Sequence, residues 1–560
     1  MENQFKYSLS TIIKRLLNFA RPIKSYLIIS TLASIIGNLS HIGLMGFGSL
    51  YLLSLTSYLN TNPDKWLILT IISASLIAIC RYLEGVYSHI GAYGVLASLR
   101  VHLFSIIDRI SPAFLIDHKK GDLMSIAIND IETLEYFFAH TIGPMFTVII
   151  LPLVTLIVAY QIHPYYFMVL LPLFILISIV IPLIALKAGN NIGMNYRKSL
   201  GELKSLVLES VYGIRDIQIY NDGEKRLEKI LNENEIVNKA SHGLTLHQQI
   251  LSSVPNFFIY IARILIIVVS AYLISINQNN PSETILISFV AAASFSSTFS
   301  LTFVVTHLLE TFAAAKRIFI IEDTIPTVNQ KETTQTCGEI QNIKFNNVSF
   351  TYPNTDVEVL KNLNFEIKKG DKIGIFGPSG IGKSTLFRLL LRFYDPNFGT
   401  ISFNHIDLKD LSFNEIYQRI DMLEQETYLF DATIFNNIAL AKEGASLDEV
   451  KKAAEKAGIA SLIDTLPEGY NTEMGQMASR LSGGEKQRIG IARIMLACPD
   501  IIVMDEPTSA LDVFHEKELL HTLKTEYSDA TWLIISHRMS TLTCCNRLYK
   551  LENGQLIQIN

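Results

Sequence analysis

A glycine-rich run in the second half of the chain has the spacing of a phosphate-binding loop, GxxxxGK[ST]. Backbone N–H groups in such a loop face a phosphate chain, Lys383 reaches the β- and γ-phosphates, and the Ser384 hydroxyl reaches Mg²⁺. The helix expected to start there adds the positive end of its dipole. The run therefore predicts a site for a nucleoside triphosphate with Mg²⁺. The residues expected to bind it are Gly377, Ser379, Gly380, Gly382, Lys383, Ser384 and Thr385.

Two acidic residues follow a strand further along the chain. Ile501–Met504 is uniformly apolar and precedes Asp505 and Glu506, which is typical of a strand buried on both faces. At the carboxyl end of a strand beside the phosphate loop, Asp505 is expected to hold Mg²⁺ through water and Glu506 to polarise the attacking water. The alternative, a solvated acidic pair, fits poorly directly after an apolar strand.

Gln425 and His537 also follow expected strands. Gln425 comes after Ile420–Leu423 and is expected to reach the metal and the lytic water. His537 ends the strand Trp532–Ser536 and is expected to hydrogen-bond the γ-phosphate, since an imidazole can donate in either protonation state. Taken singly, each would more often be a surface residue. Their catalytic interpretation depends on the other residues of the site.

Two further features point to the base of the nucleotide and to a second chain. Tyr352 ends the strand Ile343–Tyr352 and is expected to stack on adenine, although a tyrosine at a strand end is often a core residue. The run Ser509-Ala510-Leu511-Asp512 follows the Glu506 turn and is expected to touch a second copy across an interface.

The composition indicates a membrane protein with a separate soluble region. The chain has 560 residues, of which 49% are hydrophobic, and the apolar stretches are concentrated in the first part. The net charge of −5 disfavours nucleic-acid binding, which needs a concentrated basic face. The five cysteines form no CxxC pair, so neither a disulfide framework nor a zinc site is indicated.

Six stretches are long and apolar enough to cross a bilayer. They are centred on residues 24–56, 64–92, 136–160, 164–187, 246–276 and 283–312. Lysine and arginine occur on alternate connections, as expected of cytoplasmic loops, which places both termini and the soluble region in the cytoplasm. The expected location is the cytoplasmic membrane, and the lipid bilayer is an expected partner. The expected domains are an interfacial elbow helix at 1–22, a membrane domain at 23–320, a linker at 321–340 and a nucleotide domain at 341–560.

The cytoplasmic connections and the charged residues within the spans are the other features of this half. The connections at 93–135 and 188–245 are helical in pattern and are expected to reach the nucleotide domain, rather than being solvated loops. Arg81 and His89 are costly in a bilayer and are expected to face the protein interior, where they could line a substrate path. The alternative for Arg81 is an internal ion pair with Glu84.

The order of these motifs, together with one more, resembles the ATP-binding cassette (ABC) family. The additional motif is Leu481-Ser482-Gly483-Gly484-Glu485-Lys486-Gln487-Arg488. Behind six spans, it resembles an exporter half-transporter: a helical membrane domain with long cytoplasmic extensions, fused to an α/β phosphate-loop domain. The resemblance implies ATP hydrolysis coupled to export. It also implies that Ser482, Gly483, Gly484 and Gln487 of one protomer close over ATP bound to the other, so that a second half-transporter is required.

Shorter motifs in the membrane half resemble the CydC subunit of the CydDC transporters. They are Arg81-Tyr82-Leu83-Glu84, His89, Leu99-Arg100-Val101, Ser111-Pro112-Ala113, Gly121-Asp122-Leu123 and Asn129–Leu134. This resemblance implies a CydD-like partner, export of cysteine or glutathione, and a link to cytochrome bd and haem, with Arg81 and His89 as the pair expected near haem. The alternatives are a homodimeric lipid or drug exporter and an ATP-gated switch that does not pump.

Overall fold

The structure is a computed structural model whose described part forms two compact units. It describes residues 7–56, 59, 61–117, 120–329, 335–353, 355–475, 481–508, 513–526 and 530–559. The first unit comprises Met1–Arg109 and His118–Thr324, and the second comprises Ile110–Asp117 and Ile325–Asn560. The run Ser509–Asp512, expected to touch a second copy, lies outside the described residues.

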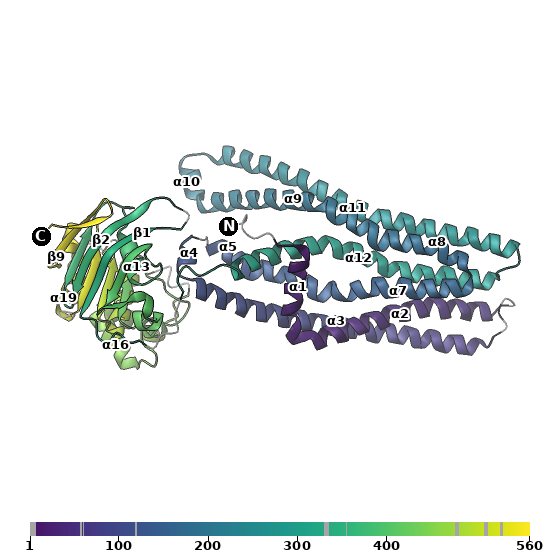
Figure 1. Cartoon of the computed structure of the whole chain (residues 1–560), viewed down its shortest axis with the longest axis horizontal. Coiled ribbons are helices and arrows are strands. Elements are labelled where there is room, and N and C mark those ends of the chain that lie inside the picture. Colours follow the sequence, from purple (N-terminus) through teal and green to yellow (C-terminus); the bar gives the residue numbers. More distant parts are fainter. Residues whose placement is uncertain are drawn as a thin grey trace. The chain divides into compact units, whose positions relative to one another are not determined.

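The first unit consists of helices, several of them long (Figure 1). The early helices are α1 (Leu9–Phe19), η1 (Arg21–Ile23), α2 (Lys24–Ser54), α3 (Pro63–Ile110), α5 (Lys120–Ser125), the π-helical η2 (Ile126–Asp130), α6 (Ile131–His140) and α7 (Ile142–Ile162). The later helices are α8 (Pro164–Ile175), the π-helical η3 (Leu176–Val180), α9 (Ile181–Tyr212), α10 (Ile214–Ile219), α11 (Gly223–Ser275) and α12 (Pro281–Glu322).

Helix packing in this unit uses small residues. Helix α2 packs against α7 and α12, and α11 packs against α8, α9 and α12. The buried side of α2 carries Ser34, Gly37, Gly46 and Ser49. A Cβ added at Gly46 would lie 3.3 Å from Val290 Cγ2 of α12. Small residues let apolar helices approach closely where no hydrophobic force drives them together, as in a bilayer.

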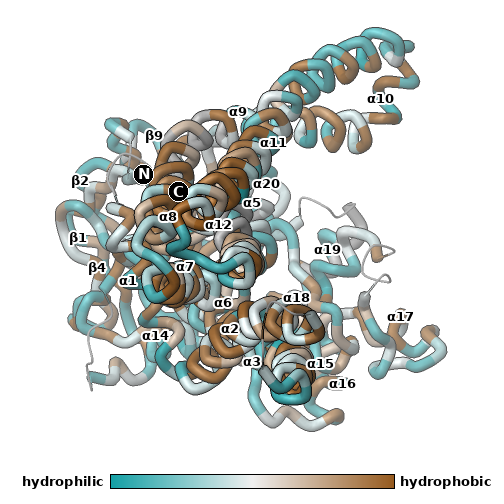
Figure 2. Tube along the Cα trace, turned by 90° about the vertical axis from the view of Figure 1, so that its right-hand side faces the viewer, coloured by the Kyte–Doolittle hydropathy of each residue, from teal (hydrophilic) through white to brown (hydrophobic). Residues whose placement is uncertain are grey.

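Five helical stretches of the described chain are long and apolar enough to cross a membrane. They are Arg21–Ser54, Pro63–Ile110, Gly121–Ile162, Pro164–Ala185 and Gly223–Ser275. The sixth expected span falls on α12, whose described apolar part is the shorter stretch Pro281–Phe295. Several of these helices are longer than a bilayer crossing requires. In α9 and α11, the hydrophilic stretches lie next to α10 (Figure 2).

The N-terminal helix α1 has a buried apolar face and a charged contact with the end of α12. Ile12 and Leu16 are buried, as an amphipathic helix requires, and the Ser8 hydroxyl accepts a capping hydrogen bond from Thr11 N–H. However, Arg15 does not face the solvent. It pairs with Glu322 and Asp323 at the end of α12, at 2.6 Å in each case. The sequence could not show this contact because its partners are more than three hundred positions away.

Two short helices interrupt the long cytoplasmic segments. Helix α4 (Ala113–Asp117) belongs to the second unit, where Ala113 is 2% exposed and joins a buried cluster with Leu408 and Leu411. Helix α10 belongs to the first unit and is flanked by the exposed side chains of Tyr212 and Tyr220. Both helices lie within the two connections, 93–135 and 188–245, whose pattern predicts helices.

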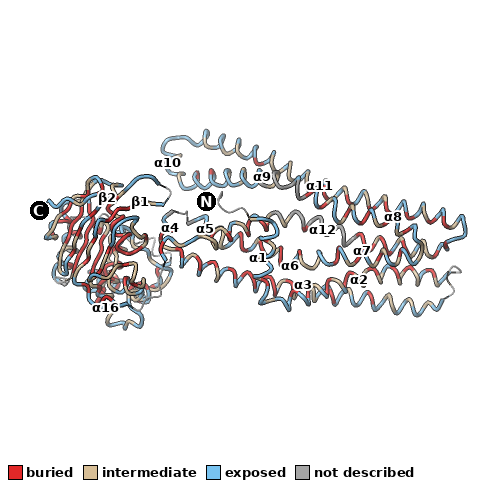
Figure 3. Tube along the Cα trace, viewed as in Figure 1, coloured by how far each residue is buried: buried red, intermediate tan, exposed pale blue. Residues whose placement is uncertain are grey.

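The second unit is an α/β domain with two sheets. The four-stranded sheet has the order β2 (Glu358–Lys368), β1 (Asn342–Thr351), β4 (Phe398–Phe403) and β5 (Ile406–Asp407). The six-stranded sheet has the order β10 (Gln555–Gln558), β9 (Arg547–Glu552), β3 (Lys372–Phe376), β8 (Thr531–Ile535), β7 (Ile501–Asp505) and β6 (Ile420–Leu423). The strands from β9 to β6 are parallel, and the inner strands β3, β8 and β7 are largely buried (Figure 3).

Helices and short 3₁₀ turns complete the second unit. They are α13 (Lys383–Leu390), η4 (Leu408–Asp410), α14 (Phe413–Tyr417), α15 (Ile434–Ala439), α16 (Leu447–Lys456), α17 (Ala460–Thr465), η5 (Gly469–Asn471), α18 (Gly483–Ala497), α19 (Val513–Glu526) and α20 (Met539–Leu542). Two buried clusters hold the domain together: one contains Ile375, Phe387 and Val503, and the other contains Ile491, Ile502 and Trp532. Burial on both faces explains why β7 and β8 are apolar throughout.

Candidate functional site

Four neighbouring parallel strands end at the same edge of the six-stranded sheet. The order β3, β8, β7, β6 brings together the residues that follow each strand: the phosphate loop, His537, Asp505 with Glu506, and Gln425. Ile535 pairs with both Ile375 and Asp505, which fixes the register of the three inner strands. Ligands of parallel α/β sheets bind outside the carboxyl ends of the strands. The fold therefore gathers at one edge residues that lie far apart in the sequence.

The phosphate loop has the conformation that its glycines permit. Gly382 has φ +109°, and a Cβ there would lie 2.3 Å from Val359 Cγ1, so a side chain at this position is excluded by both conformation and space. Ser379 and Gly380 are exposed at the turn. The loop thus leaves backbone accessible at the start of α13, where anions bind readily.

Lys383 lies at the base of this loop. It is 6% exposed, and its Nζ donates to the carbonyl oxygens of Gly377 at 2.8 Å and Pro378 at 2.9 Å. A buried ammonium group is costly unless it is paired. Two carbonyl dipoles are weaker partners than a phosphate, so the ammonium group is suited to bind the β- and γ-phosphates when ATP is present.

Ser384 and Asp505 form the pair that fits Mg²⁺. The Ser384 hydroxyl donates to Asp505 Oδ2 at 2.8 Å. Burial raises the pKa of Asp505, the hydrogen bond from Ser384 opposes this, and the neighbouring Glu506 carboxylate raises it further. A cation between these oxygens would relieve the repulsion. Mg²⁺ is held by one or two protein oxygen ligands together with phosphates and water, so this donor set fits the ion.

Glu506 and His537 face each other at the next two strand ends. His537 Nδ1 lies 3.3 Å from Glu506 Oε1, with 52% and 20% of the two side chains exposed. Glu506 has φ +49°, and its N–H donates to Ile535 O at 2.8 Å. A left-handed non-glycine residue is uncommon and tends to occur at functional sites. The turn thus places a carboxylate and an imidazole together beside the phosphate loop.

Gln425 and Gln487 are connected by a contact that the sequence did not predict, and their expected contacts with the metal, the lytic water and the nucleotide remain predictions. The side chain of Gln487 on α18 is 1% exposed, and its Nε2 donates to the backbone oxygen of Gln425 at 3.2 Å. The side chain of Gln425 is exposed. Arg493, which the sequence analysis missed, donates to Tyr428 O at 3.0 Å and to Asn437 O at 2.7 Å. Gln487 and Arg493 therefore hold the backbone of the segment that carries Gln425.

The signature residues start α18. Ser482 is its N-cap and forms a capping box with Glu485, in which Ser482 Oγ accepts from Glu485 N and Glu485 Oε2 accepts from Ser482 N–H at 2.7 Å. Ser482 and Gly483 are exposed. Their partners lie within α18 itself, so the structure does not join them to the phosphate loop of the same chain. Binding of ATP by Ser482, Gly483 and Gly484 remains a prediction.

Tyr352 is tied to the phosphate-loop helix. Its hydroxyl lies 2.9 Å from Thr385 Oγ1 and accepts from Arg388 Nη1 at 2.9 Å. Its ring packs edge-on against Tyr394, with the centroids 5.3 Å apart. Stacking on adenine remains a prediction for this residue. The contact with Arg388, which the sequence analysis did not include, anchors Tyr352 beside the loop.

In the membrane unit, Arg81 and His89 have separate partners. Arg81 donates to Glu84 Oε2 at 2.8 Å and to Asn38 Oδ1 at 3.1 Å, so the internal ion pair weighed as an alternative is present. His89 Nδ1 lies 3.0 Å from Glu135 Oε1. A carboxylate at one imidazole nitrogen is the usual support for a metal at the other, so His89 alone fits the haem expectation.

Comparisons with known proteins agree with this arrangement. Residues 27–299 match the family model described as ABC transporter transmembrane region, and residues 360–509 match the one described as ABC transporter. A probable ABC transporter ATP-binding/permease protein of Haemophilus influenzae is 31% identical over 97% of this chain and 99% of its own length. The structure of a bacterial Atm1-family ABC exporter with ATP bound covers 95% of this chain and 94% of its own, with a TM-score of 0.83 and 21% identity. The predicted fold class is confirmed.

Two further relatives differ in what their names say they transport. An ATP-dependent lipid A-core flippase of Syntrophus aciditrophicus is 29% identical over 98% of this chain and 91% of its own length. The glutathione/L-cysteine transport system ATP-binding/permease protein CydC of Escherichia coli is 27% identical over 85% of this chain and 83% of its own. Identities this similar do not choose between the two substrates.

Proposed function

This chain belongs to the ABC transporter family as a half-transporter with fused membrane and ATP-binding regions, and we propose from that premise that it exports small amino-acid-derived thiols with a CydD-like partner. As a family member, it is an ATPase coupled to transport, using ATP and Mg²⁺. We place both termini and the nucleotide domain in the cytoplasm, on the charge distribution of the connections.

A polar cavity in the membrane unit carries the substrate proposal. It has a volume of about 280 Å³. Its lining comes from α6 and α12 and consists of Glu132, Thr133, Glu135, Tyr136, His140, His307, Glu310 and Thr311. Three carboxylates in one cavity favour a solute with a positively charged group. Cysteine and glutathione both carry an α-ammonium group, whereas a phosphorylated lipid would bring negative charge against these carboxylates.

Cationic and neutral partners on neighbouring helices moderate the acidic charge. Arg197 of α9 lies 2.9 Å from Glu310 Oε1, and His89 of α3 pairs with Glu135. Basic side chains therefore lie beside the carboxylates that line the cavity, and this combination suits a zwitterionic solute better than an apolar drug or a lipid tail. The ring of Tyr136 lies tilted against that of His307, with the centroids 4.1 Å apart, and this contact forms part of the cavity wall.

Coupling is proposed to use the exposed signature and the transverse helices. Ser482 and Gly483 are free to close over ATP held by a second cassette, so that two chains share each nucleotide. The exposed Tyr212 and Tyr220 flank α10 and offer a docking surface to the partner's nucleotide domain. Closure of the two cassettes would then reach the membrane helices through α9 and α11, and hydrolysis would reset them.

Inverted membrane vesicles test the proposal. Vesicles from cells that express this chain with its partner are expected to take up radiolabelled cysteine or glutathione when ATP and Mg²⁺ are added. The double variant Glu135→Gln with Glu310→Gln is expected to lose uptake while keeping basal ATP turnover. ATP-dependent flipping of a fluorescent phospholipid without thiol uptake, by this chain expressed alone, would instead support the homodimeric lipid exporter.

The link to haem is tested separately. Purified protein titrated with haem is expected to show an absorbance band of ligated iron that His89→Ala abolishes, while Arg81→Ala leaves it because Arg81 is engaged by Glu84. Identical spectra for wild-type and His89→Ala protein would remove haem from the proposal and leave the thiol exporter untouched.

A further inference from the structure

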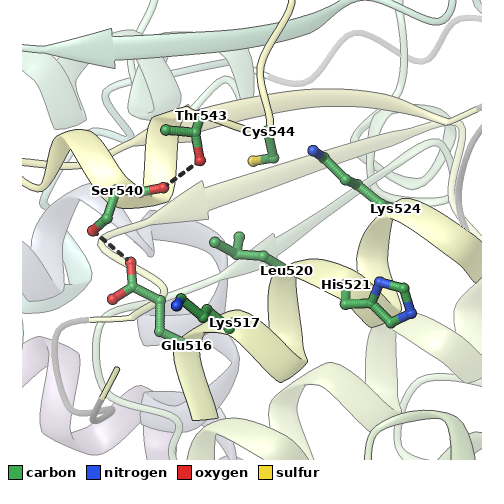
Figure 4. Close-up of a pocket in the computed structure, with 8 residues that line it drawn as sticks. All are labelled: Glu516, Lys517, Leu520, His521, Lys524, Ser540, Thr543 and Cys544. Carbon is green, nitrogen blue, oxygen red and sulfur yellow. Dashed lines mark hydrogen bonds between the residues drawn. The ribbon is translucent and has the colours of Figure 1, made fainter. Parts of the chain in front are cut away.

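The nucleotide domain has a second cavity, outside the ATP-binding edge. It has a volume of about 400 Å³ and lies between α19 and the segment that begins with α20 (Figure 4). The residues that matter here are Glu516, Lys517, His521 and Lys524 on one side and Ser540 and Cys544 on the other. The size is within the range of about 300–1,000 Å³ typical of small-ligand sites.

The charge of this cavity is positive. Lys517, His521 and Lys524 follow one another at helical spacing on one face of α19, and all three are exposed. The negative charge of Glu516 is offset by Arg538, whose Nη1 lies 3.6 Å from Glu516 Oε2. Glu516 Oε1 accepts from Ser540 Oγ at 3.0 Å and from Thr541 Oγ1 at 2.7 Å. The cavity is therefore suited to a small anionic ligand.

A thiol also lines the cavity. Cys544 is 6% exposed, and its Sγ donates to Thr541 O at 3.0 Å. The next residue is Cys545, whose thiol donates to Cys544 and lowers the pKa of Cys544, with the charges of Lys524 and Lys372 adding to this and burial opposing it. The thiolate is the form that attacks disulfides. Cationic side chains and a nucleophilic sulfur thus share one cavity.

We propose that Cys544 is a modification site for small anionic disulfides, of which glutathione disulfide is the example. The Cys544 thiolate attacks one sulfur of the disulfide. A new S–S bond forms between Cys544 and one glutathionyl group, and the original S–S bond breaks. The other half leaves as a thiolate and takes a proton from water. Cys544 is oxidised and the departing sulfur is reduced, so no further oxidant is needed.

Modification would reach the ATP site through Glu516. This residue is 4% exposed, and it joins the cavity wall to the segments that follow Glu506 and His537. Thr508 Oγ1 donates to it at 3.4 Å, and Arg538 Nη1 donates to Thr508 O at 3.1 Å. A bulky group on Cys544 would push against Ser540 and Thr541 and so displace the turn that carries His537. The modified protein should therefore turn over ATP more slowly.

The test uses the purified full-length transporter and glutathione disulfide. Peptide mass spectrometry is expected to find glutathione on Cys544, and ATP turnover is expected to fall and to recover with dithiothreitol. Cys544→Ser should keep basal turnover and resist the disulfide. Cys498, which is exposed and lies outside the cavity, is the matched control: Cys498→Ser should remain sensitive. Glutathione found on Cys498 but not on Cys544 would contradict the assignment of Cys544 as the modification site.

A second variant tests the cavity without altering the thiol. Lys517→Gln combined with Lys524→Gln is expected to slow the reaction of Cys544 with glutathione disulfide about threefold or more, while the reaction with the cationic disulfide cystamine is not slowed. Recognition by charge would be contradicted if the variant slowed both reactions equally or slowed neither of them. Full ATP turnover by protein that is modified on Cys544 would overturn the coupling through Glu516. Mass spectrometry detects the adduct on Cys544 whether or not the protein transports a solute. A missing adduct would therefore count against this modification site and not against the proposed export.

Discussion

The substitution Glu506→Gln tests the catalytic assignment most simply. The side chain is 20% exposed and its nearest described partner is His537 Nδ1, at 3.3 Å. An amide of the same shape keeps an oxygen for that imidazole but cannot accept a proton from water. General-base catalysis contributes about 10²–10⁴-fold, so ATP turnover should fall by that factor, which corresponds to about 3–5 kcal/mol in the barrier.

Binding should survive this change. The phosphates are expected to be held by Lys383 and the loop, which Glu506 does not contact in the described structure. Removing a negative charge nearby also does not weaken the binding of an anionic ligand. Phosphate release from purified transporter and binding of a fluorescent ATP analogue measure the two effects. Glu552→Gln, which alters a carboxylate paired with Lys550 on β9, is the control. Turnover above about a tenth of wild type, with the control unaffected, would refute Glu506 as the base.

Three other predictions concern the same domain. Gly382→Ala should abolish ATP binding, measured by the same analogue, because its Cβ would meet Val359 Cγ1 at 2.3 Å in a left-handed conformation; binding close to wild type would contradict this. The raised pKa of Asp505 means that its ionised, Mg²⁺-holding form is lost as the pH falls through a value above the usual 3.8. The affinity for Mg²⁺ should therefore weaken as the pH falls toward that value, because the ion must displace a proton from Asp505; an affinity that does not change with pH would be inconsistent. Arg392→Met should lower the free energy of unfolding of the nucleotide domain by about 1–3 kcal/mol, because Arg392 is 3% exposed and its guanidinium donates to Leu411 O and Asn329 O. Thermal denaturation checks this, and an unchanged midpoint would speak against it.

The elements of the ATP site could be predicted because their signals are local. The phosphate loop is a contiguous run, and strands β6, β7 and β8 are short apolar runs whose ends carry the reactive residues. What the sequence could not provide is the order β3, β8, β7, β6, which brings these ends to one edge. That order depends on how all the strands and helices of the domain pack together and not on any one segment.

Contacts between distant residues were missed for the same reason. Glu516 carries no motif, and its role emerges only when Thr508, Ser540 and Thr541 are seen to donate to it. Gln487 was predicted to contact nucleotide of a second chain, which stays a prediction; its hydrogen bond to the Gln425 backbone was not predicted. Its helix can be predicted from the capping box, but the direction of a buried amide depends on which segment packs against that helix.

In the membrane half, hydropathy identifies the helices but not their polar contacts. The pattern of the expected elbow helix does not reveal that Arg15 pairs with Glu322 and Asp323. His89 was grouped with Arg81, yet it meets Glu135. A charged side chain among apolar helices must find a partner, and periodicity along one helix cannot say which neighbouring helix supplies it.

The central claim is that each ATP is shared by two cassettes, and trapping of nucleotide with vanadate tests it most directly. In a dimer whose two chains carry different tags, Ser482→Ala is introduced into one chain only. Trapped nucleotide is expected to be lost from the unsubstituted chain, whose phosphate loop faces the altered signature, and to persist better on the substituted chain. Loss of trapped nucleotide from the substituted chain alone would contradict the account.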